Sequence, residues 1–208
     1  MSTHTVRETT TPGEASRANA YKLLSECFQG PEDDLVTLIE AAADEPLPVR
    51  IDPALVEDVQ ALRVDHAKLF VGPFELLAPP YESVYVDDVD RVMTRSTLAL
   101  EHAYRQEGLD IGLDEPADHV AAELEFMYYL VGEELEALLD LDIDTATHYL
   151  QTQQDFLEEH LGVWIEAFAE NVVEHAETEF YRTVARETTR FVAADLEELA
   201  ENPLLVDE

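Results

Sequence analysis

The sequence predicts an all-α fold, a single globular helical domain of about eight helices, from three observations. Apolar residues recur at helical spacing along most of the 208 residues, and at 46% hydrophobic content the chain can bury one sizeable core. No Asn-Gly or Asp-Gly turn joins two alternating apolar runs, so the signals for β-hairpins are weak. Glycine and proline fall mainly between the periodic segments, where they end one helix and start the next.

The polar ends of the chain are expected to lie outside this domain. Residues 1–13 are rich in threonine and close with Pro12-Gly13, a composition that favours a disordered tail. The helical domain is then expected at 14–200, followed by a flexible C-terminal tail at 201–208. No internal repeat of fixed period is visible, so the sequence predicts one domain rather than an array.

Apolar periodicity and the residues that end each segment predict the individual helices. Their expected ranges are 14–28, 31–43, 53–70, 87–107, 118–139, 144–160, 163–175 and 178–199. Gly30 ends the first helix, and Pro31 with the acids after it starts the second, because carboxylates are favourable at a helix N-terminus. Pro116 and Asp118 mark the start of the fifth helix, with Asp118 as the expected N-cap. Gly162 separates the sixth helix from the seventh.

The stretch from Pro73 to Asp87, PFELLAPPYESVYVD, is the one long segment without helical rhythm. Pro79 and Pro80 favour extended backbone at and before them, so we expect a long proline-rich central loop and no helix here. Its aromatic and aliphatic side chains carry too much apolar surface for a solvated linker. Long ordered loops inside compact domains are often functional, which makes this stretch the candidate recognition element.

The net charge of −35 is the most extreme feature of the composition. Only 12 basic residues face 47 acids, and the acids are spread along every segment. Even spreading favours a surface adapted to high salt, where self-repulsion is screened, and it argues against binding nucleic acid. With no secretory signal, no apolar run long enough for a membrane span and the single Cys27, we expect a cytoplasmic protein without stable membrane insertion.

Motifs that would indicate catalysis or a metal are missing from the sequence. There is no HExxH, no Glu-x-x-His pair, no Walker loop and no GxSxG. The acids at 140–144 mimic the start of a calcium loop, but Thr145 replaces the required glycine and Gln151 the bidentate Glu. His119 and Glu123 are four residues apart and are too few for a metal site by themselves. We expect no cofactor and no enzyme, with a metal-dependent enzyme kept as an alternative.

Five ordered segments carry a resemblance to a known protein family. They read YKLLSECF at 21–28, LFVGPFELLAPPYESVYVD at 69–87, RSTLALEHAY at 95–104, EPADHVAAELEFM at 115–127, and FLEEHLGVWIEAFAENVVEHAETEFYRTVARETTRF at 156–191. In order and spacing they are similar to the cytoplasmic chaperones of molybdoenzymes, the TorD/DmsD/NarJ-type redox enzyme maturation proteins. The STLAL and Pro-Pro-aromatic-x-Ser-Val-Tyr stretches resemble the DmsD-like branch most.

The resemblance implies an all-helical chaperone that catalyses no reaction. Such a protein binds the twin-arginine leader of an apo-molybdoenzyme, here a dimethyl sulfoxide reductase-like catalytic subunit, and holds it for cofactor insertion before export. Its expected partners are the leader and the body of that subunit. A NarJ-like assembly chaperone for a nitrate reductase-type subunit is the alternative. The sequence does not distinguish a monomer from a homodimer.

The resemblance places the signal-peptide site in two regions. One is the central loop, with Tyr81 and Ser83, and the other is the helix start with Asp118 and His119. The chain departs from the DmsD-like pattern at Tyr81, where Trp is usual, and at Glu82, where Gly is usual. A structural role remains open for each of these residues, since Asp118 can be a plain N-cap and Tyr81 a packing residue.

The chemistry of a twin-arginine peptide extends this candidate set. Two guanidinium groups require carboxylates that accept bidentate hydrogen bonds, and the apolar segment after them requires an apolar groove. The acids expected to serve are Asp118, Glu123 and Glu82, and the expected apolar lining is Tyr81, Tyr85, Leu124 and Phe126. His66, His160 and Trp164 are expected only to pack helices or their ends.

Overall fold

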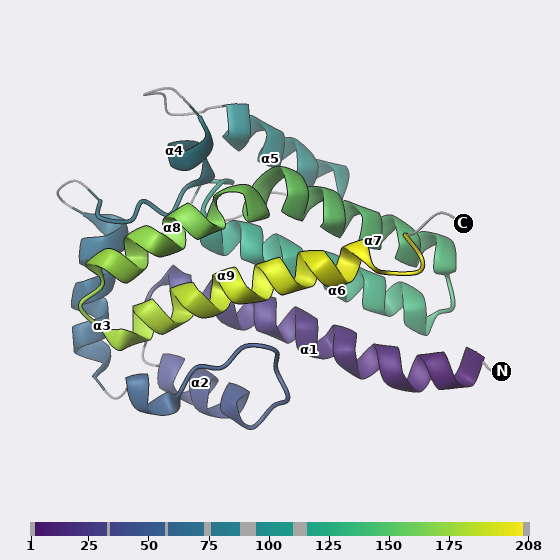
Figure 1. Cartoon of the computed structure of the whole chain (residues 1–208), viewed down its shortest axis with the longest axis horizontal. Coiled ribbons are helices and arrows are strands. Elements are labelled where there is room, and N and C mark those ends of the chain that lie inside the picture. Colours follow the sequence, from purple (N-terminus) through teal and green to yellow (C-terminus); the bar gives the residue numbers. More distant parts are fainter. Residues whose placement is uncertain are drawn as a thin grey trace.

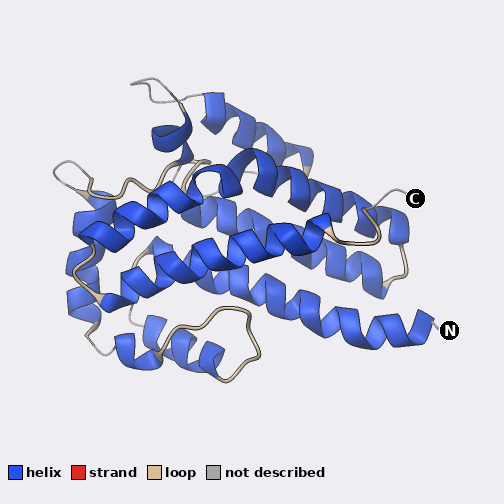
Figure 2. Cartoon of the chain, viewed as in Figure 1, coloured by secondary structure: helices blue, strands red, loops and turns tan. Residues whose placement is uncertain are grey.

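The computed structural model describes residues 3–32, 34–56, 58–72, 76–87, 95–109 and 116–205, with side chains from residue 13 onward. Within these ranges the regular structure is helical and there is no β-strand (Figure 2). One isolated antiparallel bridge joins Tyr81 to His119. The predicted all-α fold is therefore confirmed.

The helices follow one another with short connections. The first part of the chain forms α1 (Thr3–Gln29), α2 (Leu35–Ala43), the 3₁₀ turn η1 (Pro53–Val56), α3 (Val59–His66) and the π-helical turn η2 (Ala67–Val71). The middle forms α4 (Glu82–Val86), α5 (Arg95–Gln106) and α6 (Val120–Leu139). The last part forms α7 (Ile143–Phe156), the π-helical turn η3 (Leu157–Leu161), α8 (Gly162–His175) and α9 (Glu179–Ala200).

Helix α6 lies at the centre of the packing. It runs beside α1 and against α7, while α8 pairs with α9 (Figure 1). These helices bury large apolar side chains against one another. Four of them have no accessible surface: Leu24 of α1, Leu124 of α6, Phe168 of α8 and Tyr181 of α9. The short α4 packs on α5 and α8, and it lies at one edge of the bundle. This arrangement places the end of α1, the chain before α4 and the start of α6 close together.

A buried charge centre fixes α1 to α6, α7 and α9. The Arg17 guanidinium donates to Glu134 Oε2 at 2.6 Å and to the side-chain oxygen of Gln153. Its Nη1 lies 3.5 Å from Asp195 Oδ1, and Tyr21 donates its hydroxyl to the other Asp195 oxygen at 2.6 Å. Buried ions are tolerated only when they are paired and hydrogen-bonded, so this arginine is held by groups from all three helices.

Several helix boundaries differ from those predicted. Helix α1 begins at Thr3 rather than Glu14, because extending a helix whose core part is already packed costs far less than nucleating one. The expected helix over 53–70 is divided into η1, α3 and η2. The helix expected over 87–107 corresponds to α5, which begins at Arg95. Residues 88–94 of that expected range lie outside the described chain.

The central stretch is only partly a loop. Residues 76–81 are extended or turned as its prolines predict, but Glu82–Val86 forms the helix α4, so the expectation of no helix is wrong there. Residues 73–75 lie outside the described chain. The restriction from Pro80 acts on itself and the residue before it, and it leaves the residues after Tyr81 free to turn into a helix.

None of the helices in the described ranges combines the length and the apolar content that crossing a membrane requires.

Candidate functional site

The chain before α4 and the start of α6 are joined by backbone hydrogen bonds. Val120 N donates to Pro80 O, and Glu82 N donates to Asp118 O, each at 2.9 Å. Between these bonds Tyr81 and His119 face each other, with ring centroids 5.4 Å apart and ring planes at 72°. The extended backbone that the prolines impose makes this pairing possible. Two regions separated by more than thirty residues in the sequence thus form one wall.

A cavity of about 420 Å³ opens beside this wall. Its volume falls within the ~300–1,000 Å³ typical of ligand sites. The apolar part of its lining comes from Phe28, Phe70, Val71, Leu76, Ala121 and Ala122, and the polar part from Gln29, His66, Tyr81 and His119. The end of α1, the turn η2 and the start of α6 therefore surround it, and Val71, 65% exposed, forms an apolar rim.

His119 caps helix α6, a role that the sequence assigned to Asp118. Its Nδ1 accepts a hydrogen bond from Ala121 N at 3.1 Å. Burial, with a smaller contribution from the nearby His66 and an opposing one from Asp118, lowers the pKa of His119 to about 4. The ring is therefore neutral near pH 7, and because Nδ1 accepts, its proton resides on Nε2. His119 brings a neutral N–H donor to this site.

Asp118 is buried, and its carboxylate serves the local fold. One oxygen accepts a hydrogen bond from Ser83 N at 3.3 Å, which ties α4 to the start of α6. The side chain is 2% exposed and does not line the cavity. The N-cap prediction is wrong because the carboxylate turns to α4, leaving the imidazole of the next residue to cap α6.

Glu82 and Glu123 are also buried, although the sequence analysis placed both among the guanidinium acceptors. Glu82 is 2% exposed and lies 3.1 Å from His160 Nδ1. Glu123 is fully buried, and Trp164 donates its indole N–H to one carboxyl oxygen at 3.2 Å. Burial, and next the charge of Glu82, raises the pKa of Glu123 well above its usual range. Burial therefore favours the protonated, neutral form of Glu123 inside the bundle.

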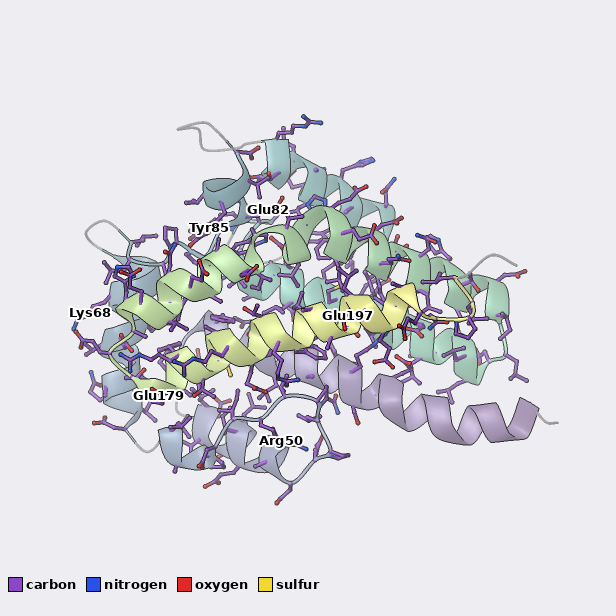
Figure 3. The ribbon with its side chains drawn as sticks, viewed as in Figure 1. Arg50, Lys68, Glu82, Tyr85, Glu179 and Glu197 are labelled. Carbon is purple, nitrogen blue, oxygen red and sulfur yellow. The ribbon has the colours of Figure 1, made fainter. Side chains whose placement is uncertain are left out.

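Tyr85 links α4 to α8 near the buried Glu82. Its ring stacks on that of Trp164 with centroids 5.5 Å apart, and its hydroxyl accepts a hydrogen bond from Asn171 at 3.2 Å. Figure 3 labels Tyr85 and Glu82, which both come from α4 beside α8. Burial raises the pKa of Tyr85, so its hydroxyl keeps its proton near pH 7. Tyr85 does not line the cavity and instead anchors α4.

The structure thus divides the seven predicted site residues into two groups. Tyr81 and His119 line the cavity. The other five do not: Glu82, Ser83, Tyr85 and Asp118 hold α4 in place, and Glu123 bonds Trp164 in the bundle. Leu124 and Phe126 belong to the core rather than to the cavity lining. Whether a site residue faces the cavity or the core depends on which face of α4 and α6 packs inward. The position of these residues near the prolines in the sequence does not reveal that face.

Several residues of this region were not among the predicted site residues. His66 and Phe70 line the cavity, while His160 and Trp164 bind the buried acids behind it. His160 and Trp164 lie far from the central stretch in the sequence, whereas His66 and Phe70 lie just before it, in a segment that the periodicity assigned to a packed helix. One signal was present at Glu123, which lies beside the apolar face of its predicted helix, because a buried acid there requires a buried hydrogen-bond partner.

Within the described ranges, no three His, Cys, Asp or Glu side chains gather in a way that could hold a metal ion.

Comparisons with known proteins relate the chain to chaperones. Residues 26–170 match the family model described as nitrate reductase delta subunit. A perchlorate reductase assembly chaperone protein from Dechloromonas aromatica is 34% identical over 142 residues, which cover 65% of this chain and 62% of the relative. Chaperone protein TorD from Vibrio cholerae is 28% identical over 203 residues, covering 86% of this chain and 90% of the relative. Chaperone protein YcdY from Escherichia coli is 30% identical over 145 residues, covering 70% and 68%.

A solved structure shares the architecture. It is that of a candidate redox enzyme maturation protein from Archaeoglobus fulgidus, with a TM-score of 0.58 and 24% sequence identity. The match covers 85% of this chain and 93% of that one. At this identity the likeness shows that the two chains share a fold.

Proposed function

Because this chain belongs to the nitrate reductase delta subunit family, the family of TorD/NarJ-type redox enzyme maturation chaperones, we propose that it serves a molybdenum-containing oxidoreductase subunit. It binds the twin-arginine leader of that subunit in the cytoplasm and holds the protein for cofactor insertion before export. The client is a dimethyl sulfoxide reductase-like catalytic subunit. Members of this family are named as chaperones and not as enzymes.

The observation that carries this proposal is the cavity beside Tyr81 and His119. It is open at its apolar rim, and its walls combine aromatic and aliphatic surface with the N–H donor of a neutral imidazole. Apolar side chains of an extended segment gain free energy by entering such a cavity, and a ring N–H can bond a peptide carbonyl. Tyr81 offers its ring face to an arginine or to an apolar side chain.

The test is peptide binding in molar salt. We expect a fluorescein-labelled peptide with Arg-Arg followed by an apolar stretch to bind, and its Lys-Lys version to bind more weakly, because lysine cannot form bidentate pairs. Tyr81→Ala should weaken binding by about 1–3 kcal/mol if Tyr81 is a hot spot. Fluorescence anisotropy measures both.

The matched control for this test is Tyr128→Ala. Tyr128 is an aromatic residue of α6 that is 38% exposed and does not line the cavity. Its variant should bind the leader as the unmodified protein does. Equal affinity for the Arg-Arg and Lys-Lys peptides would contradict guanidinium recognition, and equal loss in both tyrosine variants would remove the cavity from the site.

A NarJ-like role is the second candidate, and the family model favours it by its description as nitrate reductase delta subunit. In that role the chaperone would grip an N-terminal segment of a subunit that stays inside the cell. A pull-down from the native organism separates the two candidates, because only an exported client carries the Arg-Arg leader. Recovery of a client without that pair would favour the NarJ-like role.

A further inference from the structure

A second, shallower hollow adjoins the cavity beside Tyr81. This neighbour has a volume of about 630 Å³ and shares the two residues Gln29 and His66 with the first. The turn after α1 lies where the two hollows meet. There Gly30 has a φ of 123°, and a Cβ at this position would lie 3.4 Å from His66 Cε1, so the backbone passes close to the imidazole. The Nε2 atom of His66 lies 3.3 Å from Phe28 O, within hydrogen-bond distance. The two hollows therefore adjoin at Gln29 and His66, and together they are called the groove below.

The two halves of this groove differ in chemistry. The half beside Tyr81 is walled by large apolar side chains, whereas the other is lined by Gln29, Gly30, Pro31, Glu32, Asp34, Arg63 and His66. Glu32 and Asp34 are exposed, and the Asp34 side chain makes no capping bond to α2. Arg63 donates through Nε to Pro31 O at 3.0 Å, which holds its guanidinium against the wall. Among its described lining residues, the second half thus presents the carboxylates of Glu32 and Asp34 beside the Arg63 guanidinium.

The acids expected to bind the leader do not face this groove. Glu82, Asp118 and Glu123 are each at most 2% exposed, and none of them lines either half. Their carboxyl groups bond to His160, Ser83 and Trp164 inside the bundle. A guanidinium that reached them would have to displace these partners and enter the core, at the cost of losing its own hydration. The carboxylates that recognise arginine must therefore be sought elsewhere.

We propose that the groove binds an extended peptide in which basic residues adjoin an apolar stretch, with Glu32 and Asp34 accepting from the guanidinium groups. This inference rests on the proposed function and assigns the parts of the leader to parts of the groove. The apolar residues occupy the half walled by Phe28, Phe70 and Tyr81, and the arginines occupy the half beside α2. His66 lies beneath the peptide where the two meet.

Overall acidity does not provide this selectivity. The net charge of −35 is spread over the surface, and in molar salt such diffuse attraction extends only about 3 Å. Two carboxylates that contact the guanidinium groups directly keep most of their effect, because a charge-assisted hydrogen bond acts at contact distance. Their place at the end of an apolar groove distinguishes Glu32 and Asp34 from the other exposed acids.

The experiment compares two neutralising double variants of the full chain. Glu32→Gln with Asp34→Asn removes the proposed acceptors, and Glu40→Gln with Asp44→Asn removes the same charge from exposed positions at the far end of α2. With the labelled Arg-Arg peptide in molar sodium chloride, we expect the first variant to bind about tenfold more weakly or worse, and the second to bind normally. A peptide with Gln-Gln in place of Arg-Arg should bind all three proteins equally.

The outcomes separate this inference from the proposed function. If the leader binds and Tyr81→Ala weakens it, but the two double variants bind alike, the proposed function stands and the role of Glu32 and Asp34 is refuted. If the first variant loses affinity equally for the Arg-Arg and Gln-Gln peptides, the carboxylates do not recognise guanidinium and the inference fails. If the unmodified protein binds no leader, both proposals fail.

Discussion

At the scale of single residues, the buried acid Glu123 gives a testable pH dependence. Its side chain is fully buried, and one carboxyl oxygen has no hydrogen-bond partner among the described residues. Its pKa is raised by burial and by the charges of Glu82 and Asp118. A raised folded-state pKa stabilises the native state fully below the unfolded-state pKa of about 4.3, and this contribution is lost as the pH rises toward the folded-state value.

Glu123→Gln should therefore stabilise the protein near neutral pH. Glutamine imitates the protonated acid and can still accept from Trp164, and it avoids the cost of keeping a proton that the unfolded chain releases. We expect a gain on the order of 1 kcal/mol or more in the free energy of unfolding at about pH 7.5, shrinking to nothing near pH 4. Urea denaturation at constant salt across this range measures it.

The control for this measurement is Glu40→Gln. Glu40 is exposed on α2, so its neutralisation should change stability little at any pH in the range. A difference between Glu123→Gln and the unmodified protein that stays constant from pH 7.5 to 4 would show that packing, and not protonation, distinguishes them.

The sequence predicted individual site residues unevenly. The family resemblance named Tyr81 and His119, in the proline-rich stretch and at the helix start, and the structure brings the two together at the cavity. The partners of Glu82 and Glu123 could not be read from local pattern, since His160 and Trp164 come from η3 and α8, far along the chain. The hollow beside α2 could not be predicted either, because only the fold brings residues 29–34 to Arg63 and His66.

At the scale of elements, the π-helical turn η3 depends on Gly162. A Cβ built on this glycine would lie 2.4 Å from Leu157 O, closer than any real contact of that kind. The missing side chain lets the wider turn continue directly into α8, and η3 carries His160 toward α4. The sequence analysis read this glycine as a break between helices, whereas it permits a continuous but locally widened helix.

Gly162→Ala should destabilise the protein although alanine is the better helix former. The clash is with backbone, so η3 or α8 must shift, and we expect a loss of about 1–3 kcal/mol in the free energy of unfolding. Gly132→Ala on α6 is the matched control, because a Cβ there meets nothing within 4 Å. That variant should gain about 0.5–1 kcal/mol from helix propensity. Urea denaturation measures both, and a gain in both would refute the role assigned to Gly162.

The existence and order of the helices were predictable because each long helix carries its own apolar face. The residues at which the helices begin and end were less predictable. Asp58 caps α3 by accepting from Ala61 N at 3.0 Å, and this divides a region that periodicity alone read as one helix. Asp142, from the run that mimics a calcium loop, caps α7 through Thr145 N in the same way. A capping side chain competes with continuation of the helix, and the packing around the residue decides which of the two occurs.

At the scale of the whole molecule, the net charge of −35 acts against folding in dilute salt. Folding brings the acids closer together, so their mutual repulsion is larger in the compact state than in the unfolded chain. Salt screens this repulsion, with a Debye length of about 10 Å at 0.1 M that falls to about 3 Å at 1 M. Exposed acids without a basic partner contribute most, whereas the paired Arg17 centre lies inside the bundle and is screened little.

We therefore expect the melting temperature to rise by several degrees between about 0.1 M and 1 M sodium chloride, in step with the screening length. Replacing Glu166, Glu170 and Glu197 by Gln removes three exposed charges, and it should stabilise the protein in low salt but not at 1 M. Differential scanning calorimetry at neutral pH measures both proteins, and potassium chloride should act like sodium chloride because screening depends on ionic strength. An equal gain for the triple variant at both salt concentrations would indicate a local effect at the replaced positions, and a melting temperature independent of salt would contradict self-repulsion as the dominant effect.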